Sequence, residues 1–264
     1  MPADMTALLD DLRAEHADLD ALVEGTDLTA DSAAAGWTIG DCVGHLWYFD
    51  REATRALVDP DAFHNEVARI VADPAAYMQA HLDAARAHGD ALLAVSRQTR
   101  AELLAALADA DPAAKVPWYG PPMSPASFAT ARLMEYWAHG QDVADAIGVR
   151  RVATARLRHI CHLGVRTRNF SYAVRGMPHA DIEVRVELTA PDGNDIWGWG
   201  EQSTAERITG PAEDFALVVT QRRHIEDTAL AVTGEAANEW MHIAQAFAGT
   251  PTLTDPARAG AGRT

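Results

Sequence analysis

A glutamate and a histidine stand four positions apart in the segment "RLMEYWAHGQD", residues 132–142. Positions i and i+4 of an α-helix lie one above the other, so Glu135 and His139 are predicted to project from the same side of one helix. Asp142 follows on that side. Another histidine, His45, lies centrally in a second predicted helix among apolar neighbours, and its ring is expected to point inward as well.

This set of side chains could perform metal chemistry. A neutral imidazole and a carboxylate that are buried without partners cost several kcal/mol, whereas a divalent cation satisfies all of them together. Two imidazoles and one carboxylate leave a coordination position for water or substrate. That arrangement is typical of catalytic zinc, and nickel, iron and manganese accept the same ligands. A metal site is therefore one interpretation of His45, Glu135 and His139.

Spacing alone favours a simpler interpretation of the same residues. Glu135 can pair with an arginine, and a histidine at i+4 can hydrogen-bond within a helical bundle. Asp142 is equally open, because it suits either a carboxylate that orients a metal ligand or an ordinary exposed acid. The residue pattern by itself leaves these alternatives undecided.

The elements that must position these side chains are helices. Thr38 begins one helix with a capping-box-like sequence, and Ser124 followed by Pro125 begins another. Gly89 weakens the helical pattern around it without ending the predicted helix. The predicted helices span residues 5–24, 38–58, 74–107 and 124–148. They predict an N-terminal all-α four-helix bundle over residues 1–150.

An aromatic, proline-rich crossover, "DADPAAKVPWYGPPMSP", precedes the last of these helices. It contains Trp118 and Tyr119. We expect this loop to cover the metal and form an apolar wall for a cofactor or substrate. The alternative is a rigid linker that packs on the end of the bundle.

The second half of the chain has a different pattern of apolar and charged residues. After a helical stretch over 154–173, apolar and charged residues alternate in "DIEVRVELTAPDGNDIWGWG", which predicts a β-hairpin. "STAERIT" is a further candidate strand, and residues 211–222 and 234–248 return to helical spacing. These features predict a smaller α+β domain over residues 151–252 and a flexible tail over 253–264.

Composition limits the classes of partner. The chain has 22 Lys and Arg against 38 Asp and Glu, and its net charge of −16 opposes binding to the phosphate backbone of a nucleic acid. No apolar run is long enough to cross a bilayer, and "MPADMTALLDDLRAEH" is acidic where a signal peptide is basic. We therefore expect a cytoplasmic protein without nucleic-acid or membrane partners, either a monomer or a homodimer.

The cysteines and the other histidines give weaker signals. Cys42 and Cys161 each lie in an apolar helical pattern and are expected to be small buried side chains without a disulfide. His159 and His162 flank Cys161, but no fourth ligand for a second metal site is evident. The remaining histidines, including His81, lack ligand-like spacing and are predicted to be surface or core residues.

The helical half resembles a known superfamily. The segments "GWTIGDCVGHLWYFD" and "LMEYWAHGQDVADAIG" are similar to the DinB-like superfamily, and specifically to its mycothiol-dependent maleylpyruvate isomerase branch. The resemblance covers the chain. It implies that His45, Glu135 and His139 are metal ligands, and it gives Asp142 a place beside them.

The C-terminal half also resembles that branch, through "RVELTAPDG", "GPAEDFALVVTQRRH" and "GEAANEWMHIAQAFAG". The resemblance implies a sterol-carrier-like fold and an arginine from this domain that reaches the active site. Arg222 and Arg223 are the matching positions, and the sequence does not choose between them. The whole chain is also similar to an actinobacterial subgroup of metal-binding proteins, whose description names no reaction.

The resemblance implies a metal-dependent enzyme that acts on a small organic substrate with a low-molecular-weight thiol such as mycothiol. Zinc is the first expectation for the metal, with nickel, iron or manganese as alternatives. An isomerase and an S-transferase both fit. A metal-dependent hydrolase, lyase or cyclase that uses no thiol, and a non-catalytic metal-binding protein, remain alternatives.

Overall fold

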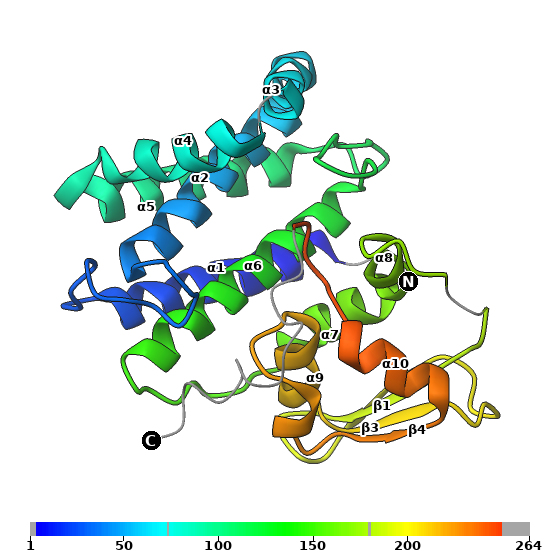
Figure 1. The fold of residues 1–264 in the computed structure, drawn as a ribbon. Helices are drawn as coiled ribbons and strands as arrows, with labels where there is room; N and C mark the ends of the chain where they lie inside the picture. The colour runs from blue at the N-terminus through cyan, green and yellow to red at the C-terminus, as the bar shows by residue number, and fades with distance from the viewer. Residues whose placement is uncertain (1–3, 73, 179–180, 250–264) are drawn as a thin grey trace. The chain divides into compact units, whose positions relative to one another are not determined.

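The computed structural model describes residues 4–72, 74–178 and 181–249 (Figure 1). The chain divides into two compact units, Met1–Arg150 and Arg151–Thr264. The predicted tail over 253–264 lies outside the described residues. No helix among the described residues is long and apolar enough to span a membrane.

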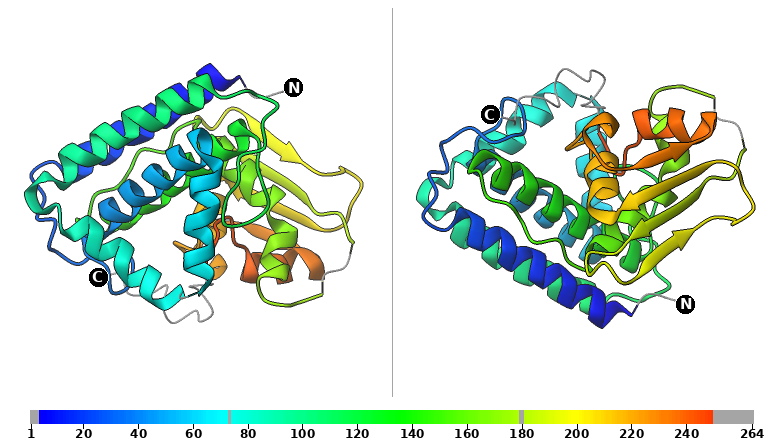
Figure 2. Two further views of the ribbon diagram at one scale, coloured as in Figure 1. Left: turned by 90° about the horizontal axis from the view of Figure 1, so that it is seen from above. Right: turned by 90° about the horizontal axis from the view of Figure 1, so that it is seen from below.

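The N-terminal unit is a bundle of long helices. Its main members are α1 (Met5–Val23), α2 (Ile39–Val58), α5 (Leu92–Asp109) and α6 (Pro125–Ala146). Helix α1 packs along α6, and α2 packs along α5 and α6 (Figures 1 and 2). Apolar side chains at helical spacing fill the interior, among them Leu12, Leu46, Leu103 and Leu133, each fully buried. The predicted helical N-terminal half is therefore confirmed.

Two details of the helix prediction were wrong. The helix predicted over 74–107 is α4 (Pro74–Arg86), a 3-10 turn at Gly89–Ala91 and then α5. Gly89 adopts φ +50°, a left-handed conformation that an α-helix cannot contain, so it ends the first segment rather than only weakening it. Helix α3 (Pro60–Ala72) was not predicted, although Asp59 caps it by accepting from the Ala62 N–H at 3.0 Å.

The starts of the two helices that carry the candidate ligands agree with their capping signals. Thr38 Oγ1 accepts from the Asp41 N–H at 3.0 Å, and Asp41 Oδ2 accepts from the Thr38 N–H at 3.0 Å, which completes the capping box of α2. Ser124 Oγ accepts from the Ser127 N–H at 3.2 Å at the start of α6. These caps fix where each helix begins, and so which residues face the interior.

The C-terminal unit contains a four-stranded sheet in the order β2-β1-β3-β4. Strands β1 and β2 form the predicted antiparallel hairpin, β3 runs parallel to β1, and β4 pairs antiparallel with β3. The strands are β1 (Arg185–Thr189), β2 (Ile196–Trp199), β3 (Arg207–Pro211) and β4 (Ala231–Thr233), and the sequence did not predict β4.

The described part of the C-terminal unit also contains helices. They are α7 (Leu157–Arg166), α8 (Arg168–Ala173), α9 (Ala212–Val219) and α10 (Glu235–Ile243), with a 3-10 turn at Ile225–Asp227. Helix α9 contacts β1 and β3, and α10 contacts β4. The buried strand residues Val186, Leu188 and Ile208 supply the apolar face beneath. A small α+β region after the bundle is therefore confirmed, whereas the sterol-carrier-like assignment stays a prediction.

Candidate metal centre

The structure brings the three predicted ligands together between α2 and α6. His45 Nε2 and His139 Nε2 each lie 3.7 Å from Glu135 Oε2. One ligand atom from each residue lies within 4.8 Å of both others. The side chains are 16%, 21% and 9% exposed for His45, Glu135 and His139 respectively. Three acceptor groups therefore meet at a largely buried point.

The separations suit a single cation. Donor atoms bound at zinc distances of about 2.0–2.1 Å with tetrahedral angles lie about 3.4 Å apart. The observed 3.7 Å between ring nitrogen and carboxylate oxygen is close to that value and too long for a good hydrogen bond. His45 Nδ1 is buried and has no hydrogen-bond partner among the described residues. The donor set therefore fits a divalent metal better than it fits a hydrogen-bonded network.

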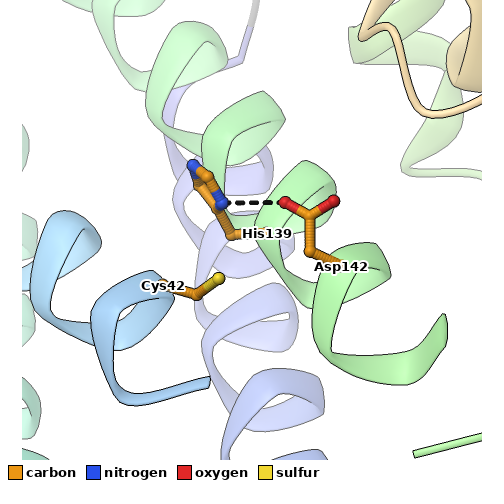
Figure 3. A group of neighbouring side chains, drawn as sticks. All are labelled: Cys42, His139 and Asp142. Atoms are coloured by element: carbon orange, nitrogen blue, oxygen red, sulfur yellow. Dashed lines mark hydrogen bonds and ion pairs between the residues drawn. The ribbon is translucent and has the colours of Figure 1, made fainter. Parts of the chain in front are cut away.

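Asp142 contacts one of the histidines. Its Oδ2 lies 2.9 Å from His139 Nδ1. A dashed line in Figure 3 marks this contact. When Asp142 is ionised it only accepts hydrogen bonds, and Nδ1 of a neutral His139 then carries the proton while Nε2 carries the lone pair. A carboxylate behind a ligating imidazole fixes the ring's tautomer and orientation. This contact is the one expected of a group that supports a metal ligand.

The protonation states also suit metal binding. Burial lowers the pKa of His45 to about 3, so its ring is neutral near pH 7. Burial alone would raise the pKa of Glu135, but the electrostatic interactions with His45, His139 and Arg132 lower it to about 2. A neutral imidazole and an ionised carboxylate are the forms that bind cations, and no proton has to leave either of them first.

A second group of potential ligands shares His139. Cys42 lies near His139 and Asp142 (Figure 3), and ligand atoms of all three fall within 4.8 Å of one another. Cys42 was predicted to be a small buried side chain, and it is fully buried, with its thiol 3.4 Å from Ser32 Oγ. Its nearness to His139 was not predicted. The signal in the sequence was its position three residues before His45 on the same helix.

Aromatic rings surround the ligands. Trp37 stacks on His139 with centroids 5.6 Å apart, and lies 5.0 Å from the His45 ring. Phe49 lies 4.6 Å from His45. His81, expected among the scattered histidines, is fully buried with its ring 5.7 Å from that of His45. Sequence reasoning assigned none of these three to the site. Trp37 and His81 lie outside the two ligand helices, whereas the position of Phe49 four residues after His45 on α2 was a signal that could have placed it beside the ligand.

Trp118 and Tyr119 connect to the site through Phe49. The Phe49 ring lies 6.2 Å from Trp118 and 5.8 Å from Tyr119. Trp118 also stacks on Phe63, with centroids 5.5 Å apart and planes 5° from parallel. The crossover thus packs on the bundle and also continues the aromatic surface that begins at His45. Both interpretations of this loop describe part of its structure, and its role as a wall for a ligand stays a prediction.

Arg222 and Arg223 follow α9 in the C-terminal unit. Gln221, which precedes them, has φ +59°, so the chain turns sharply at this point. Arg222 Nη1 donates to the Thr220 carbonyl at 2.7 Å, and Arg223 Nη1 donates to the Arg222 carbonyl at 2.7 Å. Both guanidinium groups hold local backbone, and the choice between them as a substrate-binding residue stays a prediction.

The helical half of the chain matches a known protein family. Residues 10–144 match the family described as the mycothiol maleylpyruvate isomerase N-terminal domain. Residues 182–233 match a second family, described as wyosine base formation. In solved structures, the chain is similar to a crystal structure of the mycothiol-dependent maleylpyruvate isomerase, with TM-score 0.56, 14% identity, and coverage of 87% of this chain and 93% of that one.

A histidine-to-alanine mutant of the mycothiol-dependent maleylpyruvate isomerase gives TM-score 0.51 at 15% identity, covering 82% of this chain and 88% of that one. At these identities the likeness shows the fold. Two uncharacterized proteins of Mycobacterium tuberculosis are much closer in sequence, each 47% identical over 253 residues, which is 94% of this chain and 98% of each relative. The chain belongs to the mycothiol maleylpyruvate isomerase N-terminal domain family.

Proposed function

We propose that this protein is a zinc-dependent enzyme that uses a low-molecular-weight thiol, of the mycothiol type, either to isomerise a small electrophilic organic acid or to join the thiol to it through a new C–S bond. The observation that carries the proposal is the convergence of His45, Glu135 and His139 on one point, with Asp142 behind His139. The family membership and the fold shared with a protein named as a mycothiol-dependent isomerase support the thiol.

A divalent cation held by His45, Glu135 and His139 would supply Lewis acidity, which would lower the pKa of a thiol so that its thiolate predominates near neutral pH. The chain's own residues prepare the site for it. His45 is neutral, Glu135 is ionised, and Asp142 keeps the lone pair of His139 on Nε2. Three protein ligands leave a position for one more group, which is the feature that separates catalytic from structural sites.

The surrounding rings exclude water from one side of the ligands. Trp37 covers both histidines and Phe49 covers His45. Water exclusion strengthens the electrostatic contacts of a charged nucleophile. We also propose that Trp118 and Tyr119 contact the apolar part of the bound ligand and that Arg222 or Arg223 binds a substrate carboxylate by paired hydrogen bonds.

Two outcomes of thiol chemistry fit such a site. In an isomerase, the thiol adds to a conjugated double bond, the resulting single bond rotates, and loss of the same thiol restores the double bond in the trans form. In an S-transferase, the new C–S bond is retained. The structure of the product, with or without sulfur, distinguishes the two.

The first test is the metal content of the purified protein. We expect about one equivalent of zinc in the wild-type protein and almost none in His45→Ala and Glu135→Ala. His242→Ala is the matched control, because this exposed histidine belongs to the C-terminal unit. It should keep its metal. Full metal in both ligand variants would contradict the assignment.

The second test separates thiol chemistry from its alternative, a metal-dependent hydrolase, lyase or cyclase that uses no thiol. Cobalt replaces zinc in such sites and reports on its ligands by its visible spectrum. We expect a small thiol to change that spectrum in the wild-type protein, because sulfur occupies the remaining position. An unchanged spectrum would count against a thiol cosubstrate and favour the alternative.

A further inference from the structure

A second buried polar group lies between the same two helices. Asp50 of α2 accepts from Arg132 Nε of α6 at 2.9 Å, and also from the Tyr136 hydroxyl of α6. Asp50 and Tyr136 are fully buried and Arg132 is 3% exposed. Arg132 Nη2 also donates to the Leu46 carbonyl of α2 at 3.2 Å. We name Asp50, Arg132 and Tyr136 the Asp50 cluster.

The Asp50 cluster is close to the ligands along both helices. Asp50 follows His45 by five residues on α2, which is about 7.5 Å at the helical rise of about 1.5 Å per residue. Leu46, whose carbonyl Arg132 also binds, is the next residue after His45. On α6, Arg132 and Tyr136 stand on either side of Glu135 in sequence. The cluster therefore joins α2 to α6 within about two helical turns of the ligands.

The contacts in the Asp50 cluster are directional. A guanidinium presents its donors in a rigid plane, and here it binds a carboxylate and a carbonyl on the same helix. A slide of α2 by one residue, about 1.5 Å, would break these bonds and leave charges buried without partners. Metal ligands tolerate errors of only about 0.2 Å in distance. These hydrogen bonds between α2 and α6 are suited to holding the two helices in the register that a metal site needs.

We propose that the Asp50 cluster is a positioning device for the metal centre. By fixing α2 against α6, it holds His45 at the correct distance from Glu135 and His139. None of its members is a metal ligand, and they act through the backbone of the two helices. This inference rests on the proposed function, because it assumes that the three ligands bind a cation.

A second buried arginine in the same bundle provides a matched control. Arg100 of α5 donates from Nη2 to Asp20 Oδ1 at 2.8 Å and from Nη1 to the His16 carbonyl at 3.1 Å. It is 3% exposed, as is Arg132. Arg100 joins α5 to α1, and neither helix carries a candidate ligand. Its guanidinium carbon also lies 5.7 Å from the centroid of the Tyr136 ring, but Arg100 makes no hydrogen bond to a member of the Asp50 cluster among those described. Loss of either guanidinium should destabilise the bundle, but only loss of Arg132 should disturb the metal centre.

The experiment measures zinc affinity by competition with a chromophoric chelator, using wild type, Arg132→Met, Arg132→Lys and Arg100→Met. Circular dichroism and thermal unfolding of the zinc-free proteins establish that each is folded. We expect Arg132→Met to weaken zinc binding by about tenfold or more, the effect typical of groups that orient ligands. Arg132→Lys, which keeps the charge, should recover part of that loss. Arg100→Met should lower the Tm and leave zinc affinity within about twofold of wild type.

Three results would overturn the proposal. The first is a folded Arg132→Met protein with wild-type zinc affinity. The second is an equal loss of affinity in Arg100→Met, which would make the effect one of general stability. If Arg132→Met does not fold, Tyr136→Phe decides the matter, because it removes a single donor to Asp50. We expect about threefold weaker zinc binding in that variant, and unchanged affinity is the third contrary result. Absence of zinc binding in wild type would instead overturn the proposed function itself.

Discussion

Two buried polar groups lie between α2 and α6, and they differ in how their members satisfy one another. In the Asp50 cluster, donors meet an acceptor, and Arg132 Nε lies 2.9 Å from Asp50 Oδ1. In the candidate metal centre, two ring nitrogens stand 3.7 Å from a carboxylate oxygen. The cluster is complete with protein atoms alone. The metal centre brings acceptors together, and acceptors attract one another only through a cation or a proton.

The difference also concerns charge. The Asp50 cluster pairs a carboxylate with a guanidinium, so its two buried charges are of opposite sign and compensate each other. In the metal centre, Glu135 is ionised beside a neutral His45. The two imidazole lone pairs beside Glu135 and its carboxylate are all acceptors, and a divalent ion satisfies them together. The first group is therefore expected to stabilise the fold, and the second to contribute to function at some expense of stability.

The largest expected effect is the loss of stability when the Asp50 cluster is disrupted. Asp50→Ala leaves Arg132 buried without its carboxylate, and we expect the free energy of unfolding to fall by about 3–5 kcal/mol. Glu135→Ala, measured in the same zinc-free state, should change it by less than about 1 kcal/mol. Urea denaturation of the zinc-free proteins makes the measurement. Equal losses in the two variants would remove the distinction between the two groups.

A smaller effect, on zinc affinity, tests the role of Asp142 beside the metal centre. Asp142→Ala removes the acceptor that holds His139 Nδ1, and we expect zinc affinity to fall by about 10–100-fold with little change in fold. Asp145→Ala, one turn later on α6, is the matched control and should bind zinc within about twofold of wild type. Chelator competition gives both values. Similar affinities in the two variants would show that Asp142 does not orient the ligand.

The smallest effect concerns a buried histidine outside the metal centre. Burial, with repulsion from Arg100 and Arg132, lowers the pKa of His16 to about 2. Near pH 5.5 the unfolded chain protonates this histidine, whose ordinary pKa is about 6.5, and the folded chain does not. Stability is therefore lost as the pH falls below about 6.5, at up to about 1.4 kcal/mol per pH unit.

The substitution His16→Leu removes the contribution of His16 to the pH dependence of stability. Between pH 7 and pH 5.5, the variant should lose about 1 kcal/mol less unfolding free energy than wild type does. Urea denaturation at the two pH values, with zinc removed, measures the difference. The His16 ring lies 4.2 Å from that of Tyr136. An identical pH dependence in the two proteins would mean that His16 titrates in the folded state.

Local signals in the sequence predicted much of the N-terminal unit. The capping box at Thr38 and the Ser124 cap are each completed by residues within three positions. The starts of these helices could therefore be predicted without tertiary information. The break at Gly89 was missed because glycine in a helical pattern is compatible with either outcome. Helix α3 was missed although the Asp59 cap and Pro60 were a readable start.

The candidate site could be predicted in part for the same reason. Glu135 and His139 share one helix, so their spacing alone places them side by side. His45 was linked to them by its inward position and by the family resemblance. Trp37, Phe49 and His81 were not linked to them, and neither was Asp50 to Arg132. The spacing of four residues between His45 and Phe49 could have linked these two. The other contacts depend on how separate segments pack, and spacing within one segment carries no information about that.

The most direct test of the central claim is a crystal structure of the purified protein with anomalous diffraction recorded at the zinc absorption edge. The account predicts one strong anomalous peak about 2.0–2.2 Å from His45 Nε2, His139 Nε2 and a Glu135 oxygen. A peak beside Cys42 and Asp142 instead, or no peak in protein that was supplied with zinc, would contradict it.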